Sequence, residues 1–406
     1  MKAFILAAGK GKRMRPLTVK RPKPVLPVGG KPILQHLVDN LEGKVDEIII
    51  LVGWKSENIK DTISSEETNI RYVKQEKPLG TADAVSLARK HVDDRFICMN
   101  GDVIVTEDAL HDFIDFFSEE NKTTVGMAKV ENPESYGVMI TEGKKLVDII
   151  EKPKEPKSDL INAGLYGFDS RIFKAITETE KSSRGEYEIT DSIEILMDRS
   201  DVLGFELPEN SWYELSRPWD LLSTNREIME DQLQKNIESD IEENVHIEGE
   251  VYISKDATVR EGAYLKGPIY IGENAEIGPN CYIRPATYIG EGCKVGGASE
   301  VKNSIVMSGT QVPHHNYVGD SVIGKDCNLG SGTKVANLRL DEKEIPVIHR
   351  EEKINSGRRK LGVIMGDGVK TGINSMIDPG TVIWQNSFIG PGAIANGEID
   401  PESKIQ

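Results

Sequence analysis

The chain has 406 residues and a formal net charge of −16, with 38% hydrophobic and 29% charged residues. This length suits two domains, and the composition is that of a soluble globular protein. The acidic balance argues against bulk binding of nucleic acid, and the apolar runs are too short to span a membrane. Four cysteines do not make a disulfide framework. Since Met1–Ala8 passes directly into a glycine turn, no signal peptide is expected and the predicted location is cytoplasmic.

The first stretch predicts a loop that binds phosphate. Met1–Leu6 is apolar apart from one lysine and indicates a buried strand, and Gly9 and Gly11 follow it. Backbone N–H groups in such a turn can bind phosphate oxygens. Nine basic residues fall within the first 38 positions, before the first acidic residue, Asp39. This local positive charge in an acidic chain suits a polyanionic ligand.

Two familiar phosphate loops do not fit this stretch. A dinucleotide-binding loop needs a third glycine where this chain has Arg13, whose forked guanidinium suits a triphosphate. A P-loop needs Gly-Lys followed by Ser or Thr, which is absent. An ordinary basic strand-to-helix turn remains the alternative, but Lys23 in a proline-bracketed segment argues against it.

From Lys31 to Val73 the sequence alternates between short β-branched runs and helical patterns, which predicts a mostly parallel sheet covered on both faces. Ligands of such sheets bind at the carboxyl ends of the strands. Thr81 stands where it could cap a helix. Asp102 ends a buried run, and a carboxylate beside a phosphate loop suits Mg²⁺, although a plain turn aspartate is the alternative.

These motifs closely resemble the sugar-1-phosphate nucleotidylyltransferases, which share an apolar strand, Ala-Ala-Gly, an Arg-Met turn and a Pro-Lys-Pro segment. The resemblance implies an α/β Rossmann-like domain, a nucleoside triphosphate and a sugar 1-phosphate as substrates, and Mg²⁺ as cofactor. It implies catalytic roles for Arg13 and Lys23. Nucleotide-binding positions would be Leu6, Ala8, Gly9, Gln75, Gly80 and Thr81, and sugar-phosphate positions would be Gly137, Glu151, Lys152 and Asn162.

The resemblance also implies that the metal is held by Asp102 and a second carboxylate. Relatives usually have Asp or Asn where this chain has Glu214, which keeps the charge but lengthens the side chain. Asp220 is the alternative ligand.

The second half carries a six-residue repeat. Apolar residues recur at every sixth position from Ile247 to Val301, often followed by glycine, and small residues fall between them. This period is the signature of a hexapeptide β-solenoid. Cys281, Cys293 and Cys327 match small-residue positions, so packing is their expected role. Ser308–Asn316, with two adjacent histidines, and the charged segment Leu338–Leu361 are predicted to interrupt the coil.

By resemblance this half is the left-handed β-helix of the hexapeptide acyltransferases. Several of its residues match the order and spacing of the bifunctional N-acetylglucosamine-1-phosphate uridylyltransferase/glucosamine-1-phosphate acetyltransferases, archaeal type. That match implies acetyl-CoA as co-substrate and His314, rather than its neighbour His315, as general base. The implied substrate and coenzyme contacts are Arg284, Lys302, Tyr317, Asn328, Asn337 and Lys343. Past Lys343 the match fails.

The predicted organisation is a nucleotidylyltransferase domain at 1–225, an acidic helical linker at 226–245 and an acetyltransferase β-helix at 246–406. The predicted enzyme makes UDP-N-acetylglucosamine by acetyl and uridylyl transfer, and a homotrimer is expected from the resemblance. Three alternatives remain: a solenoid that only trimerises or regulates, a non-catalytic subunit, and a glucose-1-phosphate thymidylyltransferase. The choice between UTP and dTTP stays open.

Overall fold

The computed structural model describes residues 1–406, and the chain forms two compact units. The first unit comprises Met1–Lys10, Arg21–Val25 and Pro32–Glu214. The second comprises Leu215–Gln406 together with two short segments from near the N-terminus, Gly11–Lys20 and Leu26–Lys31. No helix combines the length and the apolar character that a membrane crossing requires.

The first unit is built on one nine-stranded sheet. In spatial order its strands are β5 (Ile70–Lys74), β4 (Glu47–Val52), β1 (Lys2–Ala7), β6 (Arg95–Asn100), β11 (Leu160–Asp169), β8 (Thr124–Lys129), β12 (Leu203–Glu206), β10 (Lys145–Glu151) and β9 (Gly137–Glu142). The most apolar strands, β1 and β4, lie inside the sheet, where both faces are buried. A separate two-stranded ribbon pairs β7 (Val103–Val105) with β13 (Trp212–Glu214).

The prediction of a mostly parallel sheet is wrong for the second half of this domain. β5, β4, β1 and β6 run parallel, but β11 is antiparallel to both β6 and β8, and β10 is antiparallel to β9 and β12. A parallel neighbour needs a crossover of about a dozen residues or more, usually helical. No helix separates β9 from β10, so β10 returns in the opposite direction as a hairpin, and β11 is antiparallel to β9 as well.

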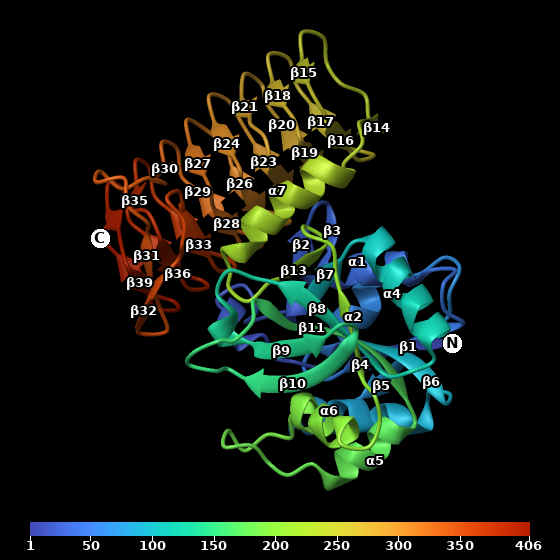
Figure 1. The fold of residues 1–406 in the computed structure, drawn as a ribbon. Helices are drawn as coiled ribbons and strands as arrows, with labels where there is room; N and C mark the ends of the chain where they lie inside the picture. Colours follow the sequence, from blue (N-terminus) through green and yellow to red (C-terminus); the bar gives the residue numbers. More distant parts are fainter. The chain divides into compact units, whose positions relative to one another are not determined.

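Helices cover both faces of the sheet (Figure 1). One buried cluster joins the sheet to α1 (Ile33–Leu41), α2 (Ser56–Thr62) and α4 (Glu107–Glu120), and another joins it to α3 (Thr81–Ser86), α5 (Arg171–Glu178) and α6 (Ile189–Met197). Short 3-10 turns lie at η1 (Lys12–Met14), η2 (Lys23–Val25), η3 (Leu87–Lys90) and η4 (Pro133–Ser135). The layered α/β architecture expected from the sequence is therefore present.

The second unit is a left-handed parallel β-helix whose coils stack to form three sheets (Figure 1). One sheet contains β14 (Asn236–Ile237), β16 (Val251–Ile253), β19 (Ile269–Ile271), β22 (Thr287–Ile289), β25 (Ile305–Val306), β28 (Val322–Ile323), β33 (Val363–Met365), β36 (Thr381–Ile383) and β39 (Glu398–Ile399). The second contains β15 (His246–Glu248), β18 (Tyr264–Lys266), β21 (Tyr282–Ile283), β24 (Glu300–Lys302), β27 (Tyr317–Gly319), β30 (Lys334–Val335), β35 (Met376–Ile377) and β38 (Ile394–Ala395). The third contains β17 (Thr258–Val259), β20 (Glu276–Ile277), β23 (Lys294–Val295), β26 (Gln311–Val312), β29 (Asn328–Leu329), β34 (Lys370–Thr371), β37 (Phe388–Ile389) and β40 (Lys404–Ile405).

The six-residue repeat is confirmed as the core of this coil. Its apolar residues from Ile253 to Val301 are buried in one continuous cluster, because each hexad forms one side of a coil and points its apolar residue inward. Three of the four free cysteines, Cys281, Cys293 and Cys327, lie in this cluster as expected. Burial raises the pKa of each of these three thiols to about 12. They are neutral packing groups.

One expected interruption is absent and the other is present. Within Ser308–Asn316, β26 pairs in line with β23, so the coil continues there. The coil length changes instead, because Ile271 pairs with Ile289, 18 positions on, whereas Ile289 pairs with Val306 and Val306 with Ile323, each 17 positions on. The segment Leu338–Leu361 does leave the coil, as the antiparallel hairpin of β31 (Pro346–His349) and β32 (Glu352–Asn355).

The segment expected as a linker is ordered. α7 (Asp220–Gln232) packs on the solenoid, and its buried Asn225 donates a hydrogen bond of 3.1 Å from Nδ2 to the carbonyl of Ala286. The ladder of the coil begins at Asn236, where β14 pairs with β16. The remaining short strands near the N-terminus are β2 (Pro27–Val28) and β3 (Lys31–Pro32).

Candidate functional site

The first unit gathers charge at the carboxyl ends of β1 and β6. Asp102 follows β6, and its Oδ2 accepts a hydrogen bond of 2.9 Å from Lys23 Nζ. The Lys23 side chain is only 7% exposed, whereas that of Asp102 is 41% exposed. The N–H of Gly101 donates to the carbonyl of Leu6, which holds this turn against β1. Two residues that are 79 positions apart, and that were both expected at the site, therefore meet at the predicted edge of the sheet.

Glu214 lies beside the same turn. It ends β13 and pairs with Val103, the residue directly after Asp102. Its Oε2 is buried and has no hydrogen-bond partner. A buried carboxylate oxygen that accepts no hydrogen bond destabilises the fold unless a cation contacts it. Mg²⁺ prefers oxygen ligands, so the carboxylates of Asp102 and Glu214 fit this ion. Asp220 instead begins α7 in the second unit, where its Oδ2 accepts from the Arg217 N–H at 2.6 Å.

Two of the six expected nucleotide-binding residues, Ala8 and Gln75, line a cavity in the first unit. Its volume is about 270 Å³, and it is bounded by Ala8, Lys10, Gly53, Trp54, Lys74, Gln75, Glu76 and Pro78. Gln75 is 8% exposed and donates from Nε2 to Asp83 Oδ2 at 3.0 Å, which fixes the orientation of its amide. The sequence reasoning missed the cavity's indole, Trp54, because no motif marked it. A flat apolar ring beside a polar amide suits a nucleobase.

Thr81 does not cap its own helix as predicted. The N-cap of α3 is Gly80, and no side chain bonds to the helix start. The Thr81 hydroxyl instead accepts a hydrogen bond of 2.9 Å from the Ile189 N–H. Gly80 has φ 130°, and a Cβ there would lie 2.3 Å from the carbonyl oxygen of Tyr187. Glycine is therefore required at this position, because the α6 entry segment crosses directly over it.

The residues expected around the sugar come together on β9, β10 and β11. Glu151 pairs with Gly137 across the hairpin, and a Cβ on Gly137 would lie 3.2 Å from the Glu151 carboxylate and 3.8 Å from Asn162. Glu151 also accepts a hydrogen bond of 3.0 Å from Arg184, which the sequence reasoning did not single out. Lys152 follows directly, with φ 47°, in the left-handed region. Together these groups form a polar, hydrogen-bonding surface.

Arg13 is exposed in the segment Gly11–Lys20, which belongs to the second unit. That segment is tied to the hairpin of the second unit, because His349 donates from Nε2 to the Arg15 carbonyl at 2.6 Å. Arg217 lies near Arg13, and burial followed by this like charge lowers the pKa of Arg217. The charge of Arg13 thus acts on Arg217, and the carboxylates of Glu352 and Asp220 oppose it.

A hydrogen-bond network in the second unit is centred on Asp320. This carboxylate is 2% exposed and accepts from Lys302 Nζ at 3.1 Å, from Asn303 Nδ2 at 2.6 Å and from Asn337 Nδ2 at 2.5 Å. Asn337 also lies 3.3 Å from the Tyr317 hydroxyl. Three residues expected at the acetyl-transfer site are therefore joined by one buried acid. Asp320 belongs to the His-x-x-Tyr-x-Gly-Asp run, so the sequence carried a signal for it that was not used.

The other expected residues of this site are more exposed. His314 and His315 are both exposed, as is Lys343 at the start of the hairpin excursion. Arg284 donates to Glu300 at 2.8 Å, and Asn328 lies exposed on β29. Within the second unit, Lys302, Tyr317 and Asn337 are thus directly connected, and the charge of Arg284 acts on Tyr317.

Comparisons with known proteins agree with this two-part organisation. Residues 2–231 match the nucleotidyl transferase family, and residues 265–382 match the GMPPB C-terminal domain. The chain is 44% identical to the "Bifunctional protein GlmU" of Methanocaldococcus jannaschii, over 100% of this chain and 97% of that protein. It is 38% identical to the "Bifunctional sugar-1-phosphate nucleotidylyltransferase/acetyltransferase" of Sulfurisphaera tokodaii, over 98% of each chain.

A solved structure resembles the first unit. A Bacillus anthracis protein, provisionally described as a glucose-1-phosphate thymidylyltransferase and solved with sucrose, aligns with a TM-score of 0.51 and 32% identity. It covers 55% of this chain and 94% of that protein, so nearly half of this chain has no counterpart in it. The archaeal relatives, in contrast, match along the whole length. The chain belongs to the nucleotidyl transferase family and, within it, to the bifunctional nucleotidylyltransferase/acetyltransferase proteins that carry a C-terminal β-helix.

Proposed function

We propose that this protein is a bifunctional enzyme that makes UDP-N-acetylglucosamine. In this proposal the second unit acetylates glucosamine 1-phosphate from acetyl-CoA, and the first unit transfers a uridylyl group from UTP to the product and releases pyrophosphate. The observation that carries the proposal is the full-length match to proteins named for both activities, combined with a separate polar site in each unit.

In the nucleotidylyl transfer, a phosphate oxygen of the sugar 1-phosphate attacks the α-phosphorus of the nucleotide, and pyrophosphate leaves in line. Both reactants are anions, so positioning and neutralisation of charge supply most of the catalysis. Lys23, which is hydrogen-bonded to Asp102, would place a positive charge on the phosphates. Glu151 and Asn162 would orient the sugar through its hydroxyl groups. Mg²⁺, held by Asp102 and Glu214, would neutralise charge on the α-phosphate.

In the acetyl transfer, the amine of the sugar must lose a proton before it attacks the thioester. A histidine with a pKa near neutrality can accept that proton, and His314 is the proposed base. Tyr317 and Asn337, oriented by Asp320, would position the acceptor. The rival reading, a solenoid that serves only for assembly, gives no reason for a buried acid that orients these polar groups.

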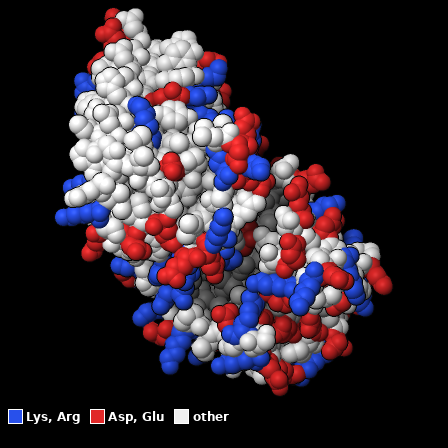
Figure 2. All heavy atoms as spheres, turned by 90° about the vertical axis from the view of Figure 1, so that its left-hand side faces the viewer, with Lys and Arg blue, Asp and Glu red and all other residues white.

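We also propose that the working form is a cytoplasmic homotrimer. The last coils expose large apolar side chains, namely Ile373, Met376, Phe388 and Ile394. Figure 2 shows that the solenoid, in the upper part of that view, has a face with few charged side chains. Exposed apolar area of this kind favours association. Light scattering should give three times the chain mass, and a monomer at working concentration contradicts the proposal.

The function is tested by two assays on one purified protein. Pyrophosphate release is measured over a panel of nucleoside triphosphates and sugar 1-phosphates, with and without Mg²⁺, and thiol release from acetyl-CoA is measured over amino sugar phosphates. The proposal requires UTP to be used with N-acetylglucosamine 1-phosphate and glucosamine 1-phosphate to be acetylated. Strict use of dTTP with glucose 1-phosphate and no acetyl transfer would instead favour a thymidylyltransferase.

A further inference from the structure

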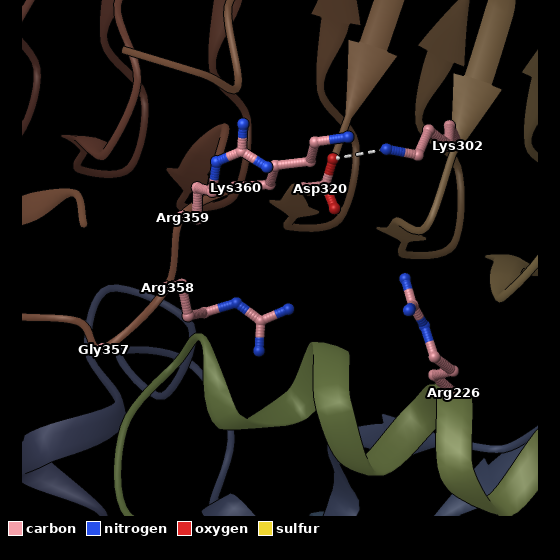
Figure 3. Close-up of a pocket in the computed structure, with 7 residues that line it drawn as sticks. All are labelled: Arg226, Lys302, Asp320, Gly357, Arg358, Arg359 and Lys360. Carbon is pink, nitrogen blue, oxygen red and sulfur yellow. Dashed lines mark hydrogen bonds and ion pairs between the residues drawn. The ribbon is translucent and has the colours of Figure 1, made fainter. Parts of the chain in front are cut away.

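A cavity of about 540 Å³ lies within the second unit and combines parts that are far apart in the sequence. Arg226 reaches it from α7, Lys302 and Asp320 from the solenoid, and Gly357–Lys360 from the segment that returns from the hairpin to the coil. In Figure 3, Arg226 and Arg358 extend towards the same space, and Lys302 approaches it from the opposite wall beside Asp320.

The cavity has more positive charge than its own carboxylate can balance. Its lining contains three arginines and two lysines but only one acid, Asp320. That acid is already used, since it accepts from Lys302, Asn303 and Asn337. Arg359 is paired with Glu342. The guanidinium groups of Arg226 and Arg358 therefore face the cavity without a carboxylate of their own.

Arg358 shows most clearly that a guanidinium group at this cavity lacks a hydrogen-bonded partner. Its Nε is buried and makes no hydrogen bond. Burial lowers the pKa of Arg358, and the like charge of Arg226 lowers it as well, against the opposing effect of the carboxylates of Asp320, Asp220 and Glu227. Two guanidinium groups that reach one cavity, neither of them in an ion pair with a carboxylate, leave a position that a tetrahedral dianion can fill, because a phosphate can accept several charge-assisted hydrogen bonds at once.

We propose that Arg226 and Arg358 hold the phosphate group of the acetyl acceptor and so make the second unit selective for phosphorylated amino sugars. This inference rests on the proposed function, since the acceptor is taken to be an amino sugar phosphate. It is favoured over an unrelated anion site because Lys302 lines the cavity and also joins, through Asp320, to Asn337 and Tyr317. Both arginines come from outside the regular coils, from α7 and from the hairpin return.

The test compares two acceptors in three variants of the full chain. Arg226→Gln and Arg358→Gln remove one guanidinium each, and Arg260→Gln is the matched control, an exposed arginine 3.8 Å from Glu276 on the same solenoid. The kcat/KM for acetyl transfer is measured with glucosamine 1-phosphate and with glucosamine. Loss of one charge-assisted hydrogen bond should lower the value for the phosphorylated acceptor by about ten- to hundredfold. The value for glucosamine should stay unchanged, so the preference for phosphate should fall by the same factor.

If the arginines had a merely structural role, the kcat/KM values for both acceptors would fall equally, and that result would overturn the inference. An unchanged preference for the phosphorylated acceptor in both variants would overturn it as well. Arg226→Lys should recover part of the preference, because it restores the charge but not the fork. Calorimetric titration with inorganic phosphate separates this inference from the proposed function. If the parent acetylates no amino sugar, the proposed function fails. The anion site then stands if Arg226→Gln and Arg358→Gln bind phosphate at least tenfold more weakly than Arg260→Gln, and falls if all three bind alike.

Discussion

Asp320→Asn tests whether one buried acid organises the acetyl-transfer site. The substitution keeps the shape of the side chain but removes the charge that lies 3.1 Å from Lys302 Nζ, and it replaces one acceptor oxygen with an N–H donor among the amide donors of Asn303 and Asn337. Only 3% of the Asp320 side chain and 16% of the Lys302 side chain are exposed. Breaking a buried ion pair on one side typically costs about 3–5 kcal/mol.

The control for this variant is Glu276→Gln on the surface of the same solenoid. Glu276 pairs with Lys294 at 3.0 Å, and both side chains are more than 40% exposed, so its loss should cost about 1 kcal/mol or less. For a unit of this size, about 1 kcal/mol corresponds to roughly 2–4 °C in melting temperature. Calorimetry on the full chain should therefore show a drop on the order of 10 °C in the solenoid transition for Asp320→Asn and almost none for the control.

The same variant should raise the KM for the acetyl acceptor, because Tyr317 and Lys302 lose their orientation, and it should leave pyrophosphate release intact. Equal melting temperatures for Asp320→Asn and Glu276→Gln, with an unchanged KM, would refute the reasoning.

Three further predictions concern residues outside this network. Burial lowers the pKa of His349, so the folded chain favours its neutral form. The contribution of His349 to the free energy of unfolding should therefore be complete above the ordinary histidine pKa of about 6.5 and should decline as the pH falls below that value. Melting curves should show that decline in the parent and less of it in His349→Gln. The buried thiols should resist aromatic disulfide reagents in the native chain at about pH 8, with all four cysteines titrating only after denaturation; prompt native labelling would contradict their packing role. Gly80→Ala should lower the melting temperature and pyrophosphate release together, since its Cβ would lie 2.3 Å from the Tyr187 carbonyl oxygen; normal values for both would show that the chain relaxes there easily.

The solenoid could be predicted from sequence in detail because its repeat reports burial directly. Each inward apolar residue, such as Ile283 or Val295, fills the same place in successive coils, so a single period specifies strands, core and stacking. The sequence analysis missed the shorter coil after Ile289. The later apolar residues still recur about every six positions, but their positions are shifted by one residue relative to the earlier repeat. The two histidines were therefore placed in an interruption that the structure does not contain.

The first unit was harder to predict, since an alternation of strands and helices gives their order but not their direction. The parallel half, with β1 inside it, follows from helical crossovers between consecutive strands. The antiparallel pairing of β11 with β6 joins strands that are far apart in the sequence, and no local pattern indicates it. Motif residues such as Lys23 and Asp102 could be assigned because loops at one sheet edge must meet. Trp54, Arg226 and Arg358 could not, because only the folded chain brings them to a cavity.

The central claim, two independent active sites in one chain, is tested most directly by crossing Asp102→Asn with His314→Ala. Both activities are measured in the parent, in each single variant and in the double variant, with folding checked by calorimetry. We expect Asp102→Asn to abolish pyrophosphate release and to keep acetyl transfer. We expect His314→Ala to lose acetyl transfer by about a hundred- to ten-thousandfold and to keep pyrophosphate release, with His315→Ala far milder. Loss of both activities in either well-folded single variant, or acetyl transfer that survives His314→Ala, would contradict the account.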